Sequence, residues 1–366
     1  MALLFGERWG VMSIAVGLLA GSAAQMLLQL FGLRDAHLRP IFNLRHPGLR
    51  RIGQLYVPVM FSLIIGEFAA ILSFNLASHT SEEGVAWMRY AAQLIQLPLG
   101  LVAMAVSFAI LPTLSQQAQL GRNASINGAQ PAQRKQMRKR WPRNEPFIST
   151  LAQGVKLVLV LTIPAAVGMF VLAEPIVGLV FEHGDFDAYD TLNTSQALRF
   201  ALLGLVFAAV DWPLNSAFYA QQDTLTPALV GLIAIAIYIV AALAPAFFGA
   251  LTLNGLILAN SVQWASHALI MLWLLNRRMR GLHGHGMLRL LSKVLTASVC
   301  MGIVTWLVAE LLAQALIPGS LIDEVFVVGI SSAIGFTVYV ALMALLRANT
   351  GGLVRGITKR RPSAIP

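Results

Sequence analysis

Charged side chains are scarce in this chain of 366 residues: Asp, Glu, Lys and Arg together make up only 11% of it. Hydrophobic residues make up 57%, and the mean hydropathy is +0.72. A soluble domain cannot hide so much apolar surface behind so few polar groups. The composition therefore excludes an ordinary soluble protein and predicts a membrane protein.

Cysteine is almost absent, since Cys300 is the single one in the chain, and this excludes an intramolecular disulfide and a paired-cysteine metal site. A phosphate-binding loop and a zinc-protease helix are lacking too. The acidic residues Asp185, Asp187 and Asp190 lie close together, but they offer too few oxygen donors for calcium. We therefore expect a protein that is not an enzyme and that holds no cofactor or metal.

The basic residues that are present fall into a pattern. Of 26 Lys and Arg residues, 22 lie in four stretches, and most acidic residues lie between them. These stretches are 34–51, 122–143, 277–293 and the tail from 347. Such alternation is the positive-inside pattern of a multispan protein and places all four stretches in the cytoplasm. The basic residues that give the chain its net charge of +10 would then lie beside anionic lipid head groups, and no nucleic acid partner is expected.

Between these stretches lie nine apolar runs long enough to cross a bilayer as helices, which takes roughly 20 residues each. None shows the ten-residue alternation of a membrane β-barrel. The chain is therefore predicted to be an all-α, polytopic membrane protein with a cytoplasmic C-terminus. The predicted spans are 11–33, 55–78, 87–114, 151–172, 191–218, 226–247, 253–275, 288–312 and 325–346.

Nine spans with a cytoplasmic C-terminus put the N-terminus outside the cell. Residues 1–9 do not form a signal peptide, because no basic segment precedes an apolar stretch with a cleavage site. The sequence thus favours an odd number of further spans upstream, and we expect the chain to be a C-terminal fragment.

Several spans contain proline, which removes a backbone donor and bends a helix unless its neighbours compensate. The strongest predicted break is Pro98-Leu99-Gly100. Membrane helices tolerate proline, so not every position should bend. The others are Pro58, Pro112, Pro164 and Pro213.

Ionisable residues at membrane depth are costly and indicate polar cavities or pairs. Glu67 in the second span and Asp211 in the fifth are the best candidates for a cavity. His267 in the seventh span is interpreted as a hydrogen-bonding residue between helices rather than a ligand. Four others lie near span ends, where long side chains reach the interface: Arg89, Lys156, Arg199 and Glu310.

Three motifs, in order and across nearly the whole chain, resemble the MurJ/MviN family of lipid II flippases. The motifs are Tyr90-Ala91 with Gln96-Leu97-Pro98-Leu99-Gly100 and Leu111-Pro112-Thr113-Leu114-Ser115; Phe181-Glu182-His183-Gly184-Asp185-Phe186 with Phe218-Tyr219-Ala220, Asp223-Thr224 and Thr226-Pro227; and Gly255-Leu256 with Arg277-Arg278.

The resemblance implies two six-helix lobes around a central cavity, followed by two extra helices. Residues 1–54 would then be the last helix of the N-terminal lobe and a cytoplasmic linker, with the rest of that lobe missing. Residues 55–275 would form the C-terminal lobe, 276–346 the two added helices, and 347–366 a basic cytoplasmic tail.

The implied activity is to move the undecaprenyl-linked peptidoglycan precursor from the inner to the outer leaflet of the bacterial plasma membrane by alternating access. A pyrophosphate-linked sugar does not cross about 30 Å of hydrocarbon unaided. The partners would be this lipid substrate and membrane lipids, and the coupling ion stays open.

The family places an arginine three residues after its signature tyrosine, where this chain has Gln93. Arg89 lies one helical turn from Gln93 and reaches toward the same cavity. Arginine suits a pyrophosphate because it keeps its charge and offers several donors. The resemblance therefore implies that Arg89 and Gln93 contact the head group, while Glu67 and Asp211 tune the cavity or couple ions.

Three alternatives remain open at this point. The chain is a flippase for another polyprenyl-linked glycan, a noncatalytic scaffold that recruits cell-wall enzymes, or a degenerate fragment. The first predicts altered surface polysaccharide on deletion. A scaffold would survive substitution of every cavity charge but fail when its cytoplasmic loops are exchanged.

The predicted orientation is testable by cysteine labelling in intact cells. After replacement of Cys300 by Ser, single cysteines at positions 138 and 359 should not react with a membrane-impermeant thiol reagent, because both lie in basic stretches. Reaction at either position without permeabilisation would contradict the orientation.

Overall fold

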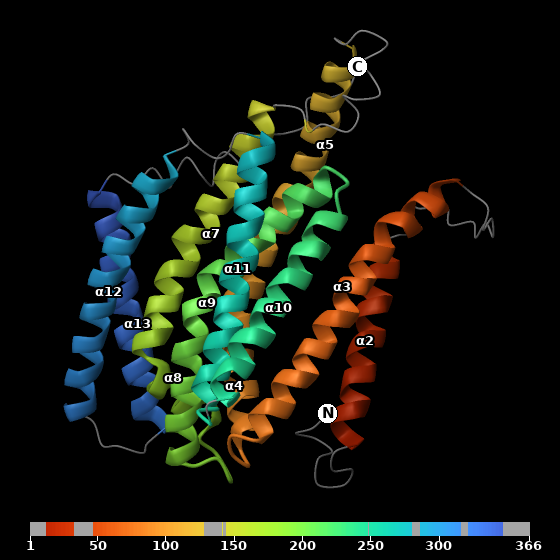
Figure 1. Cartoon of the computed structure of the whole chain (residues 1–366). Coiled ribbons are helices and arrows are strands. Elements are labelled where there is room, and N and C mark those ends of the chain that lie inside the picture. The colour runs from red at the N-terminus through yellow and green to blue at the C-terminus, as the bar shows by residue number, and fades with distance from the viewer. Residues whose placement is uncertain are drawn as a thin grey trace. The chain divides into compact units, whose positions relative to one another are not determined.

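The computed structural model describes residues 12–32, 47–127, 141, 144–247, 249–279, 286–315 and 321–346. These residues are almost entirely helical, and they contain no β-strand (Figure 1). The all-α prediction is confirmed for this part of the chain. The chain divides into two compact units, residues 1–52 and residues 53–366.

The first unit contains helix α2 (Met12–Gly32) and the beginning of α3 (Pro47–Ser78). Helix α2 covers the predicted span 11–33, and its apolar part runs from Ala15 to Phe31. Its large hydrophobic side chains, such as Leu19 and Leu28, are exposed. This surface suits contact with lipid or with another helix.

Eight helical stretches among the described residues are long and apolar enough to cross a membrane. They match the predicted spans from 55–78 onward, so eight of nine predictions are confirmed. The ninth is α2, whose apolar part is shorter than the others. The remaining elements are α4 (Gly84–Pro98), a π-helix (Leu99–Met104), α5 (Ala105–Asn127), α7 (Glu145–Val171), α8 (Ala173–Phe181), α9 (Ala188–Ala220), α10 (Leu225–Phe247), α11 (Leu253–Met279), α12 (Met287–Ala315) and α13 (Leu321–Leu345).

The predicted break at Pro98 changes the winding of the helix without ending it. Pro98 closes α4, the π-helix follows at once, and α5 continues the same rod. A membrane offers no water to a freed backbone group, so a local change of winding costs less than a break. The other four prolines lie inside continuous helices α3, α5, α7 and α9.

The segment between the predicted spans 151–172 and 191–218 begins with the short helix α8. Nine residues do not span a bilayer. The acidic cluster that follows has a structural role. The Asp187 carboxylate accepts the backbone N–H groups of Tyr189 (2.9 Å) and Asp190 (3.0 Å) and so caps α9.

Helix α9 is the centre of the second unit and packs against α4, α5, α7, α8 and α11 (Figure 1). It runs parallel to α11, and polar contacts join the two. Asn254 donates to Gln196 (3.4 Å), and the Ser261 hydroxyl donates to the Phe200 carbonyl (3.0 Å). One turn beyond Phe200, a Cβ at Gly204 would lie 2.7 Å from the Ser261 Cα. Glycine at this position therefore lets the two backbones approach closely.

Helices α12 and α13 pack against α7. Val160 and Ile163 of α7 share an apolar cluster with α12 and α13, and the hydroxyl of Tyr339 on α13 donates to the Val160 carbonyl (2.7 Å). In hydrocarbon such a bond has no water to replace it, so it holds α13 to α7.

Gly204→Leu should lower the melting temperature of the purified protein, because the added side chain meets the Ser261 backbone. Overpacking of this kind costs about 1–3 kcal/mol. The matched control is Gly329→Leu, since nothing lies within 4 Å of a Cβ at Gly329. Equal melting temperatures for the two variants would contradict the close approach of α9 and α11.

Candidate functional site

The four residues expected to form the site come from three helices. Glu67 lies on α3, Arg89 and Gln93 lie on α4, and Asp211 lies on α9. The side chains of Glu67, Arg89 and Gln93 are exposed, whereas Asp211 is half-buried.

Three of the four lie on the α3–α4 hairpin. The Arg89 guanidinium carbon is 4.9 Å from the centre of the Phe74 ring, and the Ser73 hydroxyl contacts the Met88 sulfur at 3.8 Å. In this antiparallel pair Glu67 lies deeper than Arg89, at a depth close to that of Gln93. The structure thus places all three on neighbouring helices within a few turns of one another.

Asp211 lies far from this group. The Trp87 indole donates to the Asp190 carboxylate (2.7 Å), which fixes the start of α4 beside the start of α9. Arg89 follows Trp87 by two residues, whereas Asp211 follows Asp190 by 21, or about 32 Å along a helix. The structure therefore does not bring Asp211 together with Arg89.

Asp211 instead pairs with His267 on α11. The His267 Nδ1 lies 2.7 Å from one Asp211 carboxylate oxygen, and the Asn215 amide donates to the other at 2.6 Å. Both side chains are largely buried, with 16% of His267 and 21% of Asp211 exposed. The interpretation of His267 as a hydrogen-bonding residue between helices agrees with this geometry.

Two of the sequence motifs meet in space. The ring of Tyr90 lies 4.6 Å from the Phe181 ring and 5.3 Å from the Phe186 ring. Thr191 donates to the Glu182 carboxylate at 2.6 Å, which fixes this turn onto α9. These motif residues therefore join α4 to the segment between α8 and α9.

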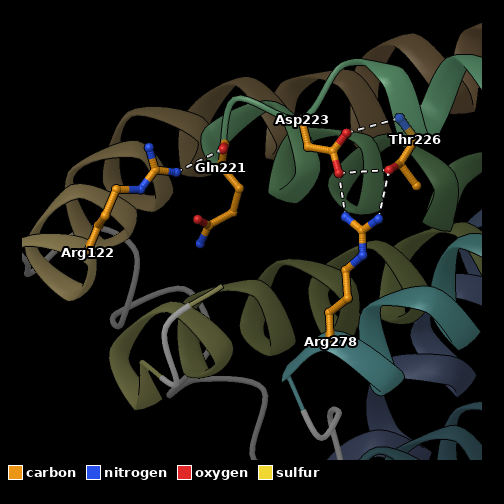
Figure 2. A network of polar contacts seen from close by, with 5 residues as sticks. All are labelled: Arg122, Gln221, Asp223, Thr226 and Arg278. Atoms are coloured by element: carbon orange, nitrogen blue, oxygen red, sulfur yellow. Dashed lines mark hydrogen bonds and ion pairs between the residues drawn. The ribbon is translucent and has the colours of Figure 1, made fainter. Parts of the chain in front are cut away.

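A polar network lies where α9, α10 and α11 meet (Figure 2). The Arg278 guanidinium pairs with the Asp223 carboxylate and donates to the Thr226 hydroxyl at 2.9 Å. Thr226 in turn donates its N–H (3.0 Å) and its hydroxyl (2.7 Å) to Asp223. Nearby, Arg122 donates to the Gln221 carbonyl at 3.0 Å (Figure 2).

The same network includes aromatic rings. The Arg278 guanidinium carbon is 5.2 Å from the centre of the Trp141 ring and 5.4 Å from that of Phe218. Sequence reasoning did not assign a role to this network, although Asp223, Thr226 and Arg278 all belong to the quoted motifs. The network joins the α9–α10 turn to the last turn of α11.

Hydrogen bonding controls the charge of Asp223. Burial acts to raise the pKa of this carboxyl, but hydrogen bonds from Thr226 and Arg278 and the charge of Arg278 outweigh it and lower the pKa below the usual 3.8. Asp223 therefore stays ionised at neutral pH, which keeps its pair with Arg278.

Cavities lie between helices in the part of the chain that the structure describes. One of about 920 Å³ has an almost wholly apolar lining from α7, α9, α11 and α12. The other, of about 260 Å³, lies between α3, α4, α9, α10 and α11 and includes the polar residues Ser73, Asn260 and Gln263. None of the four predicted site residues lines either cavity. Among the described residues, no group of three or more His, Cys, Asp or Glu side chains is placed to hold a metal ion.

Comparison with known proteins identifies the family. Residues 1–327 match the sequence model of the family described as lipid II flippase MurJ. The chain belongs to the MurJ family. This match covers most of the chain, as the resemblance of the motifs predicted.

Relatives in several bacteria match the chain. A probable lipid II flippase MurJ of Haemophilus influenzae is 30% identical over 61% of this chain and 41% of its own length. The lipid II flippase MurJ of Burkholderia cenocepacia is 28% identical over 81% of this chain and 54% of its own length. The chain thus spans about half the length of the curated relatives that it matches.

A solved structure shares the fold. The structure titled "Lipid II flippase MurJ, inward closed conformation" superposes with a TM-score of 0.65 over 94% of this chain and 64% of its own, at 22% identity. The chain is therefore a multi-pass membrane protein with the MurJ fold. That it lacks upstream spans stays a prediction.

Asp223→Asn should destabilise the protein at neutral pH but not in acid. A carboxyl whose pKa is lowered by folding contributes stability above its usual pKa, and that contribution is lost as the pH falls through the lowered value. Melting temperatures measured from pH 3 to 7 should therefore differ most at pH 7 and converge toward pH 3. A difference that is constant across this range would contradict the role of the charge.

Proposed function

We propose that this MurJ-family chain is part of a flippase that moves lipid II, the undecaprenyl-linked peptidoglycan precursor, from the inner to the outer leaflet of the bacterial inner membrane. It would act as a transporter by alternating access and not as an enzyme. Membership of the MurJ family and the eight helices long enough to span a membrane support this proposal.

The observation that carries the proposal is the polar face of the α3–α4 hairpin. Glu67 lies 20 residues after the start of α3 and 11 before its end, yet it is exposed. An acidic side chain facing lipid at mid-membrane costs about 2.5–3.5 kcal/mol on insertion scales. We infer that this face borders a hydrated cavity rather than the lipid.

The side chains on this face suit a pyrophosphate-linked sugar. Arg89 is exposed and rests on Phe74, which orients its guanidinium at little cost in side-chain entropy. A guanidinium binds phosphate oxygens through paired donors. Gln93 lies one turn deeper and offers an amide donor and acceptor to the sugar or peptide, while Glu67 tunes the charge of the cavity.

The proposal includes the arrangement of the chain in the membrane. Residues 55–275 would form the C-terminal lobe, 276–346 two added helices and 347–366 a cytoplasmic tail. Residues 1–54 would be the last helix of an N-terminal lobe and a cytoplasmic linker. The polar network around Asp223 and Arg278 would then lie at the cytoplasmic end of the lobe.

The test is rescue of a strain depleted of its own lipid II flippase, with the gene for this chain supplied in its complete reading frame. Arg89→Ala should reduce rescue at least about tenfold in colony number, because the loss of one charged hydrogen bond to phosphate costs about 1.5–3 kcal/mol. The matched control is Arg289→Ala, which removes an exposed arginine at the start of α12.

Equal rescue by Arg89→Ala and wild type, at equal protein levels, would remove Arg89 from the site. Failure of the wild-type gene to rescue, together with altered surface polysaccharide on its deletion, would assign another polyprenyl-linked glycan as substrate. Rescue that survives Ala at Glu67, Arg89 and Gln93 together would favour a scaffold.

A further inference from the structure

The pair of Asp211 and His267 lies well inside the helical bundle. Asp211 lies nine residues before the end of α9, and His267 lies 12 before the end of α11, which correspond to about 14 Å and 18 Å along the helices. The hydrocarbon core of a bilayer is about 30 Å thick. Because α11 has 27 residues, or about 40 Å, it can extend at most about 10 Å beyond this layer at one end, so His267 lies within the layer and holds Asp211 there through their hydrogen bond.

Two hydrogen-bond acceptors act on the imidazole ring. The Asp211 carboxylate lies 2.7 Å from Nδ1, and the backbone carbonyl of Pro227 on α10 also accepts from the ring. A neutral imidazole donates from one nitrogen only, whereas the imidazolium donates from both. Acceptors from two helices therefore surround the His267 ring.

Neighbouring helices complete these surroundings with uncharged groups. A Cβ at Gly231 of α10 would lie 3.9 Å from the His267 Nε2 and 3.4 Å from the Ser62 hydroxyl of α3. Asn215 holds the second carboxylate oxygen of Asp211. Tyr219, two turns further along α9, also interacts electrostatically with Asp211.

With one proton shared between them, Asp211 and His267 are neutral as a pair. Loss of that proton leaves a single negative charge in the apolar layer, and gain of another leaves a single positive charge. In hydrocarbon the free energy of each charged state is high, and it falls only when water reaches the pair and hydrates the charge. Proton binding is therefore linked to hydration of the α9–α11 contact.

We propose that Asp211 and His267 form a proton-binding site within the membrane that regulates the lobe carrying them. The proton is taken from water and bound by the imidazole–carboxylate pair, and it returns to water when the pair opens. Because the pair joins α9 to α11 and contacts α10 through Pro227, its protonation state sets how firmly these three helices hold together. This regulation rests on the proposed flippase function.

The fluorescence of two tryptophans should respond to the protonation state of the site. Trp212 is next to Asp211 in the sequence, and Trp264 lies one turn before His267. Because a protonated imidazole quenches a nearby indole, the fluorescence of the purified protein in nanodiscs should show a one-proton transition between about pH 5 and 8. His267→Gln should abolish this transition, and Asp211→Asn should displace its midpoint by at least about one pH unit.

The matched control is His79→Gln, because His79 is exposed in the turn after α3 and should leave the transition unchanged. Circular dichroism verifies that each variant is folded, and Asp211→Asn serves as the test should His267→Gln not fold. A transition that is the same in wild type and His267→Gln, or in wild type and Asp211→Asn, would overturn the proposal.

Rescue of the flippase-depleted strain tests the regulation separately. His267→Gln should rescue at least about tenfold less than His79→Gln, and equal rescue by both variants would overturn the regulatory role. Should the wild-type gene itself fail to rescue, the proposed function fails, while the fluorescence titration still decides whether the pair binds a proton.

Discussion

The close approach of α9 and α11 is the constraint on which the second unit depends. In a membrane, apolar side chains gain little by leaving lipid for protein, so helices are held by tight contact and polar bonds. Gly204 permits the contact, and Ser261 and His267 supply bonds on either side of it. Besides α11, the helices α4, α5, α7 and α8 pack on α9.

Much of the fold was predictable from the sequence, because apolar length and basic loops are direct consequences of the bilayer. The eight long spans were found this way, with ends that differ from the observed helices by up to ten residues. The π-helix after Pro98 and the short helix α8 were not, since both depend on how neighbouring helices satisfy local backbone groups. The acidic run around Asp187 was visible, but its role as a helix cap required the backbone geometry.

The candidate site was predictable only in part. Depth along a span singled out Glu67 and Asp211, but depth alone does not say which helices face one another. The structure separates Asp211 from Arg89 and Gln93 and gives it His267 as partner. The Arg278–Asp223 contact was missed for the same reason, because its partners are 55 residues apart and their pairing depends on the parallel packing of α9 and α11.

The bond from Tyr339 to the Val160 carbonyl has a mechanical consequence. Since both groups would be left unpaired in hydrocarbon if α13 moved away, the bond opposes separation of α13 from α7. Together with α12, these helices present a wide surface to the bilayer. A rocking movement of the second unit would therefore push aside more lipid than it would without α12 and α13. The thickness and viscosity of the surrounding membrane would then affect this movement.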